Sequence, residues 1–206
     1  MRAGSGRPTA EGSGAVGAIS DAGVAHVVWQ TRGRYVLVAA VLRYSRALWA
    51  ELVEEPTASW IGKALLDGAR YFGGSPRQWW LEYPDCWVAR QERNSQRLRF
   101  TPPLPELGRH LSTELGVWPR GPGLAEAALD YLAGDFAIKR GERSENNRSL
   151  RTFLDRRAQR RPHPLQAERS IAEVLAEERG HLRPLPATLE MLEAVLLGRC
   201  RDDDAD

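Results

Sequence analysis

Tyr35-Val-Leu-Val-Ala-Ala-Val-Leu42 is a near-continuous apolar run of the kind found in β-strands that are covered on both faces. Two further segments flank it, Val24-Ala-His-Val-Val-Trp-Gln30 before it and Ala47-Leu-Trp-Ala-Glu-Leu-Val53 after it. Their β-branched and aromatic residues also predict strands. Because so few residues separate the three segments, they predict an antiparallel meander rather than parallel βαβ units.

Helical patterns dominate after the meander. Pro56 is well placed to open a helix, because its missing N–H is not needed in the first turn. Apolar residues then recur at helical spacing up to Phe72, and Gly73-Gly ends the helix. Trp79-Trp-Leu81 predicts a short buried strand. Further helices are expected over residues 106–115, 124–136, 167–179 and 189–197, so the order of elements predicts an α/β fold with helices flanking a mixed sheet.

The composition is that of one globular domain with loose ends. The chain has 206 residues, 42% of them hydrophobic, and a formal net charge of only +2, so it can bury a core but has no strong global field. Cys86 and Cys200 stand far apart without companions, which excludes a disulfide framework and a zinc site. We expect residues 1–22 to be a flexible leader. The two lone cysteines suit a reducing, cytoplasmic compartment. Since no apolar run reaches membrane-spanning length, we also expect a soluble protein.

A basic segment follows the predicted helix 124–136. Residues 139–161 are polar and rich in arginine, and such a cluster can bind DNA phosphates with strong salt dependence. The alternative is a solvated, partly disordered segment, because acidic residues dilute the positive charge. His163 lies beside the cluster and is a candidate for the same role. The candidate nucleic-acid-binding residues are Arg148, Arg151, Arg156, Arg157, Arg160 and Arg161.

The seven tryptophans allow two interpretations. Exposed indoles can stack on nucleic-acid bases. However, Trp29, Trp49, Trp60 and Trp79 lie within apolar strand or helix patterns, so we expect these four to pack in the core.

Three motifs follow one another in order along the chain. Tyr44-Ser-Arg46 joins the second and third predicted strands, Tyr71-Phe-Gly-Gly-Ser-Pro-Arg77 ends the first predicted helix, and Glu177-Glu-Arg-Gly-His-Leu-Arg-Pro-Leu-Pro186 lies nearer the C-terminus. They resemble the YSR, FGG-x-PR and ER-x-x-LRPLP motifs in the integrase core of a family of bacterial insertion-sequence transposases. Members of that family pair a DDE transposase with an AAA+ ATPase helper. The resemblance covers about residues 24–186, and the family's N-terminal helix-turn-helix region has no counterpart in the sequence.

The resemblance implies a ribonuclease-H-like fold. This fold is a mixed five-stranded sheet flanked by helices, here with a helical C-terminal extension. The implied organisation is an integrase-core-like domain over residues 23–140, an arginine-rich segment and a helix over 141–186, and a C-terminal helix with an acidic tail over 187–206.

The resemblance also implies where a catalytic site would lie. In such enzymes three carboxylates hold two Mg²⁺ (or Mn²⁺) ions that drive an in-line phosphoryl displacement. Val28 occupies the position of the first Asp, and a valine cannot ligate a metal. Glu82 replaces the second Asp, with Asp85 as a substitute if the loop shifts, and Glu126 retains the third acid. We therefore expect Glu82 and Glu126 to be the remaining catalytic and metal-binding residues, in a chain that is catalytically dead or severely impaired.

Three functions are compatible with the resemblance. The first is a degenerate transposase-derived protein that binds DNA. The second is a non-enzymatic regulatory module that binds an AAA+ ATPase helper or a full-length transposase, and both hypotheses allow a homo-oligomer. The third is a nuclease rebuilt on Glu82, Asp85 and Glu126, which would have to work without a carboxylate at position 28.

Overall fold

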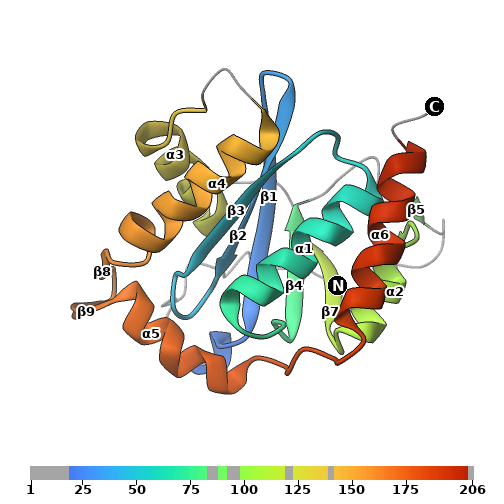
Figure 1. The fold of residues 1–206 in the computed structure, drawn as a ribbon. Helices are drawn as coiled ribbons and strands as arrows, with labels where there is room; N and C mark the ends of the chain where they lie inside the picture. Colours follow the sequence, from blue (N-terminus) through green and yellow to red (C-terminus); the bar gives the residue numbers. More distant parts are fainter. Residues whose placement is uncertain (1–18, 83–87, 92–97, 119–122, 139–141, 204–206) are drawn as a thin grey trace, which may run out of the picture.

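Five strands form a mixed sheet at the centre of the molecule, in the order β3-β2-β1-β4-β7 (Figure 1). The computed structural model describes residues 19–82, 88–91, 98–118, 123–138 and 142–203. The predicted α/β class with a mixed sheet is confirmed. The five strands are β1 (Val24–Arg32), β2 (Tyr35–Leu42), β3 (Leu48–Val53), β4 (Gln78–Glu82) and β7 (Glu114–Trp118).

The first three strands form the predicted antiparallel meander. β1 pairs with β2 from Ala25↔Leu42 to Arg32↔Tyr35, and Gly33 makes the turn between them with a φ of 66°. β2 pairs with β3 in the same sense. β4 then pairs parallel to β1, and β7 pairs parallel to β4.

Helices cover both faces of the sheet. On one face the core is built with α1 (Ala58–Phe72), α2 (Leu104–His110) and α6 (Leu189–Asp203), joined by the first turn of α5 (Ile171–Glu178). On the other face it is built with α3 (Leu124–Asp135) and α4 (Arg143–Phe153). Three of the four tryptophans expected in the core are fully packed there, and Trp29 is half-buried.

Helix α1 has well-formed ends. It begins at Ala58 rather than at Pro56, because the Thr57 hydroxyl accepts the Trp60 N–H and so caps the first turn. Gly73, with a φ of 85°, ends the helix as the sequence predicts.

The segment after α2 differs from its prediction. The sequence predicts one helix over residues 106–115, and this is wrong, because the helix ends at His110 and strand β7 follows from Glu114. Ser112 has a φ of 51°, which breaks the helical path. β7 then forms a complete ladder with β4, and this pairing with a distant strand outweighs the local periodicity.

The helix predicted over residues 167–179 is wrong in its first part. Strands β8 (Pro162–His163) and β9 (Gln166–Ser170) form a small hairpin there, and α5 begins only at Ile171. Ser170 caps α5 through a capping box, in which the Glu173 carboxylate accepts the Ser170 N–H at 2.6 Å. The final predicted helix extends past residue 197, since α6 continues to Asp203.

The arginine-rich segment is helical from Arg143 to Ala158, whereas residues 139–141 lie outside the described residues. α4 continues into a π-helical turn at Leu154–Ala158. Leu150, Phe153 and Leu154 are buried against the sheet. These apolar residues fix the segment, while five of its arginines are exposed.

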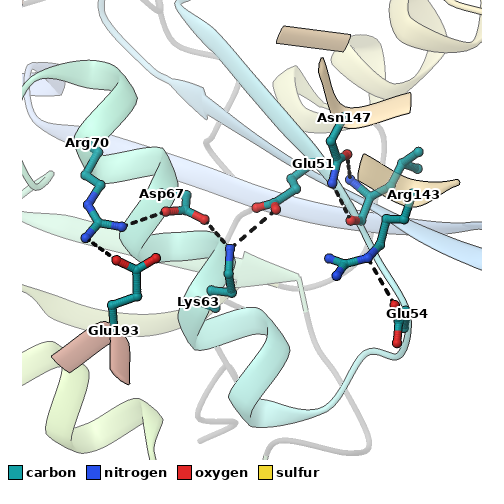
Figure 2. Close-up of polar contacts among 9 residues, drawn as sticks. Glu51, Glu54, Lys63, Asp67, Arg70, Arg143, Asn147 and Glu193 are labelled. Atoms are coloured by element: carbon teal, nitrogen blue, oxygen red, sulfur yellow. Dashed lines mark hydrogen bonds and ion pairs between the residues drawn. The ribbon is translucent and has the colours of Figure 1, made fainter. Parts of the chain in front are cut away.

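α4 and the π-helical turn also cover the edge of the sheet. The Asn147 side chain accepts the Leu52 N–H at 2.8 Å and donates to the Leu52 carbonyl at 3.0 Å, as a neighbouring strand would (Figure 2). The Gln159 amide donates to the Leu48 carbonyl at 2.9 Å. The edge strand β3 is therefore covered by its own chain.

A chain of ion pairs joins β3, α1 and α6 on the face of the sheet that α1 covers. Lys63 lies 3.5 Å from Glu51 and 2.5 Å from Asp67, and Arg70 links Asp67 to Glu193 at 3.0 and 2.6 Å (Figure 2). Burial raises the pKa of Glu51, while Lys63 acts in the opposite direction. These pairs align α1 between the sheet and α6.

The three sequence motifs contact one another although they are far apart in the chain. In the first, Tyr44 donates its hydroxyl hydrogen to Glu177 at 2.6 Å, and the Ser45 N–H donates to Glu178 at 2.9 Å. In the second, Ser75 and Arg183 exchange backbone hydrogen bonds of 2.8 and 2.7 Å. The segment 177–186 therefore acts as a strap that joins the β2–β3 turn to the end of α1.

Both ends of the chain lie partly outside the described residues. Of the leader expected over residues 1–22, only 19–22 are described, and there Asp21 pairs with Arg43 and Ala22 is buried. Of the acidic tail, Asp204 and Asp206 lie outside them. Strands β5 (Val88–Gln91) and β6 (Leu98–Phe100) pair antiparallel in a separate two-stranded sheet. Within the described ranges no helix has the length and apolar character needed to cross a bilayer.

Candidate functional site

A cavity of about 60 Å³ brings together the three positions at which the sequence analysis placed catalytic carboxylates. Val28 comes from β1, Glu82 ends β4, and Glu126 lies in the first turn of α3. The first and last of these residues are nearly a hundred positions apart in the sequence, so the fold is what brings the three together.

Strand alternation sets which side chains reach this cavity. Val27 and Leu81, a pair in the β1–β4 ladder, pack toward α1. Val28 therefore faces α3, and Glu82 follows Leu81 onto the same side of the sheet. Glu82 is only 5% exposed, whereas Glu126 is half-buried.

Three aromatic side chains that the sequence analysis did not assign to this site line the same cavity. They are His26 of β1, Trp80 of β4 and Trp118 of β7. The rings of His26 and Trp118 lie 4.9 Å apart, and those of Trp80 and Trp118 lie 6.2 Å apart, edge to face. Trp118 is 41% exposed and forms the outer wall.

Gly116 makes room for this aromatic group. A Cβ atom at Gly116 would lie 2.5 Å from the ring of Trp80, so the indole packs directly on the backbone of β7. The alternation of β1 could have identified His26, since it lies two residues before Val28 on one face. Trp118 was harder to assign, because β7 was not predicted.

His26 is neutral in the folded protein. Burial, and then the nearby charge of Arg43, lowers the pKa of His26 from 6.5 to about 4. Its side chain is 8% exposed, and Nε2 is buried without a hydrogen-bond partner among the described residues. The cavity therefore contains an unsatisfied imidazole nitrogen next to two carboxyl groups.

The residues around the cavity do not fit a two-metal centre. Val28 offers hydrocarbon where a ligand is needed, and the indole walls offer no oxygen atoms, which Mg²⁺ requires. Within the described part of the chain no group of three His, Cys, Asp or Glu side chains could hold a metal ion. Asp85, the candidate substitute, lies outside the described residues. We therefore derive no metal-dependent step for this site.

The arginine group lies elsewhere on the molecule, along α4 and the turn that follows it. Arg151 stacks over the Tyr71 ring at 4.3 Å, and half-buried Arg161 stacks over the Tyr131 ring at 3.7 Å. Among the described lining residues of the cavity there is no arginine. The exposed members, which form what we call the arginine surface, are Arg148, Arg151, Arg156, Arg157 and Arg160.

His163 does not belong to this surface. It is buried, and its Nε2 lies 3.0 Å from the Tyr44 carbonyl, while its Nδ1 accepts the Leu165 N–H. The suggestion that it shares the role of the arginines is wrong, because the β8–β9 hairpin turns this side chain into the fold.

Comparison with known proteins identifies the fold. The structure is similar to the catalytic core domain of BIV integrase, with a TM-score of 0.54 and 11% sequence identity, over 78% of this chain and 97% of that chain. The expected ribonuclease-H-like, integrase-core fold is therefore confirmed, and at this identity the likeness concerns the fold alone. No protein-family model matches the sequence, and no curated protein matches it either.

Proposed function

We propose that this chain is an integrase-core-like protein, derived from a bacterial transposase, that binds DNA and has lost most or all strand-transfer activity. The observation that carries the proposal is the meeting of Val28, Glu82 and Glu126 at one cavity of an integrase-core fold. The two cysteines are distant in sequence and suit a reducing compartment, so we place this function in the cytoplasm.

The proposed loss of strand-transfer activity follows from the side chains at the three positions where metal-binding acids are expected. In-line phosphoryl displacement on two metal ions needs acidic ligands at all three positions. Val28 supplies none, and the rings of His26, Trp80 and Trp118 line the cavity beside it. A nuclease rebuilt on Asp85 would have to replace the missing carboxylate from a different strand end, so we do not favour it.

The strap supports descent from the bacterial family. The motifs that carry the sequence resemblance contact one another through the Tyr44–Glu177 and Ser75–Arg183 hydrogen bonds. Arg179 donates to the Phe72 carbonyl at 3.0 Å and lies against Gly73. These motif residues make one structural unit, which gives a physical reason for their occurring together.

DNA binding is assigned to the arginine surface. Its side chains project from an ordered helix and the turn that follows it, so they can contact successive phosphates without first being ordered. Arginine suits phosphate because its planar fork donates two parallel hydrogen bonds.

The test is a salt titration of DNA binding, measured by fluorescence anisotropy of a labelled duplex. If four arginines each neutralise one phosphate, log Kd should rise with log salt concentration with a slope of about 3.5. The double variant R156A/R157A should lower this slope by about 2. The charge-matched control R109A/R183A, which removes two exposed arginines elsewhere, should leave it unchanged. A slope near zero for the natural chain would refute the DNA-binding proposal.

A second candidate function is supported by one feature of α6. Met191 and Val195 lie one turn apart and are 72% and 49% exposed, which is unusual for large apolar residues on a helix that already packs on α1. This feature suits a regulatory module that binds the AAA+ helper, a full-length transposase or a second copy of itself.

The two functions can be separated by co-purification and light scattering. Under the second function, the natural chain retains the helper ATPase or transposase of a related element, or forms a dimer. The variant M191E/V195E loses that association, whereas E190Q keeps it. A natural chain that is monomeric and captures neither protein leaves DNA binding as the sole proposed function.

A further inference from the structure

A mostly apolar groove of about 460 Å³ lies between α3 and the β8–β9 hairpin. Val41 and Leu48 of the sheet are buried and form its floor. Ala127 on α3 and Leu165 on the hairpin are exposed and line its two sides. Small-molecule sites are usually apolar hollows of roughly 300–1,000 Å³ with a few polar groups, so this groove has the size and the lining of such a site.

Arg161 is a half-buried cation in the lining of this groove and does not belong to the arginine surface. Its guanidinium carbon lies 3.7 Å from the centre of the Tyr131 ring, and its Nε–H donates to the Ala158 carbonyl at 3.2 Å. Within the described part of the chain, its two Nη groups donate to no acceptor. A planar fork with two parallel N–H donors matches a carboxylate.

The backbone at Arg161 is fixed by its neighbours. The Ile171 N–H donates to the Arg161 carbonyl at 2.9 Å. The Ala172 N–H donates to the Gln159 carbonyl at 2.8 Å. Pro162, which comes next in the chain, has a restricted φ. The guanidinium is therefore positioned before any ligand binds, which lowers the cost of ordering it on binding.

The charge of the lining favours an anionic guest. Arg46 contributes a second positive charge, and neither Asp nor Glu occurs among the described residues that line the groove. The apolar side chains give no hydrogen bonds to a hydrated inorganic anion, so a complementary guest must also carry apolar surface. A carboxylate on a compact hydrocarbon or aromatic body meets both requirements.

We propose that this groove binds a small organic acid, whose carboxylate pairs with Arg161 and whose apolar body lies between Ala127 and Leu165. The inference goes beyond the proposed function and does not rest on it. Arg161, Ala127 and Leu165 belong neither to the arginine surface nor to the lining of the cavity at Val28.

The test uses the intact ¹⁵N-labelled protein and phenylbutyrate as the probe acid. The probe is titrated at constant ionic strength, and the backbone N–H signals of Ala127 and Leu165 and the Nε–H signal of Arg161 are followed by NMR. We expect saturable shifts of all three signals with a roughly millimolar dissociation constant, as is usual for a ligand of this size.

Two probes with the same apolar body test the charge of the guest. Phenylbutanol should bind about tenfold more weakly than the acid, because it lacks the charge-assisted pair of hydrogen bonds. Phenylbutylamine should not bind, because its ammonium group is repelled by Arg161 and Arg46. Equal binding of the acid and either of these probes would contradict the assignment of an organic acid.

A variant at Arg161 tests whether this cation holds the carboxylate. R161Q should weaken binding of the acid about tenfold and leave binding of the alcohol unchanged, because only the acid loses an ion pair. R109Q removes an exposed arginine on α2 and should bind both probes as the natural chain does.

A second pair of variants tests whether the probe occupies the groove. A127F places a ring in the groove from an exposed position on α3 and should abolish binding of both probes, measured by the Leu165 signal. A176F makes the same change at an exposed position on α5 outside the groove and should leave binding unchanged. Because both alanines are exposed, these variants should fold even if R161Q does not. The proposal is overturned if phenylbutyrate causes no saturable shift, or if A127F binds it as tightly as A176F.

Discussion

His26 shows how one buried side chain makes the stability of this protein depend on pH. The unfolded chain titrates this histidine near 6.5, whereas the folded chain titrates it near 4. Between these values the unfolded state binds more protons. The stability due to a neutral His26 is therefore fully present above pH 6.5 and is lost as the pH falls toward 4. The difference between the two pKa values corresponds to about 3 kcal/mol.

We expect the variant H26F to lose this part of the acid sensitivity while keeping a ring beside Trp118. Free energies of unfolding from urea titrations at pH 7 and pH 4.5 should differ by roughly 2–3 kcal/mol less in H26F than in the natural chain. H110Q, which removes an exposed histidine, should behave like the natural chain. An unchanged pH dependence in H26F would contradict a neutral, buried His26.

At the scale of single residues, the sequence predicted only part of the cavity lining. Alignment with the family motifs identified Val28, Glu82 and Glu126, and the fold brings these three residues to one cavity. His26 and Trp118 carry no motif, and their proximity arises from β1 and β7 lying on either side of β4.

Asn147 shows how one helix protects the edge of the sheet. Its side chain makes both hydrogen bonds to Leu52 that a sixth strand would make. N147A should leave the Leu52 N–H and carbonyl without these partners and lower the free energy of unfolding by about 2 kcal/mol. S149A, at an exposed position on the same helix, should have little effect. Equal urea midpoints of unfolding for N147A and S149A would show that the Asn147 hydrogen bonds to Leu52 do not stabilise the protein.

The elements themselves were predictable where local pattern and tertiary structure agree. The meander, α1 and α3 follow their apolar periodicity closely. β7 and β9 do not, because each is short and is stabilised by a partner strand elsewhere in the chain. The segment 166–170 has a helical composition, and the hairpin with β8 overrides it.

At the scale of the whole molecule, the acidic cavity and the arginine surface occupy two separate regions. The acid- and aromatic-lined cavity lies where β1, β4 and α3 meet, and the arginine surface lies over the β3 edge of the sheet. The strap from Glu177 to Pro186 joins the sheet to α1 without entering either region. The cavity and the arginine surface therefore occupy separate parts of one integrase-core fold.

The most direct test of this account is a calorimetric titration of Mn²⁺ into the natural chain and into V28D, V28D/E126Q and E126Q. The account predicts no saturable binding to the natural chain, saturable binding to V28D that also raises its Tm, and loss of that binding in V28D/E126Q. If V28D folds poorly, Mn²⁺ should restore its Tm toward that of the natural chain. Saturable binding of two ions by the natural chain, abolished in E126Q, would contradict the claim that Val28 has disabled the metal site.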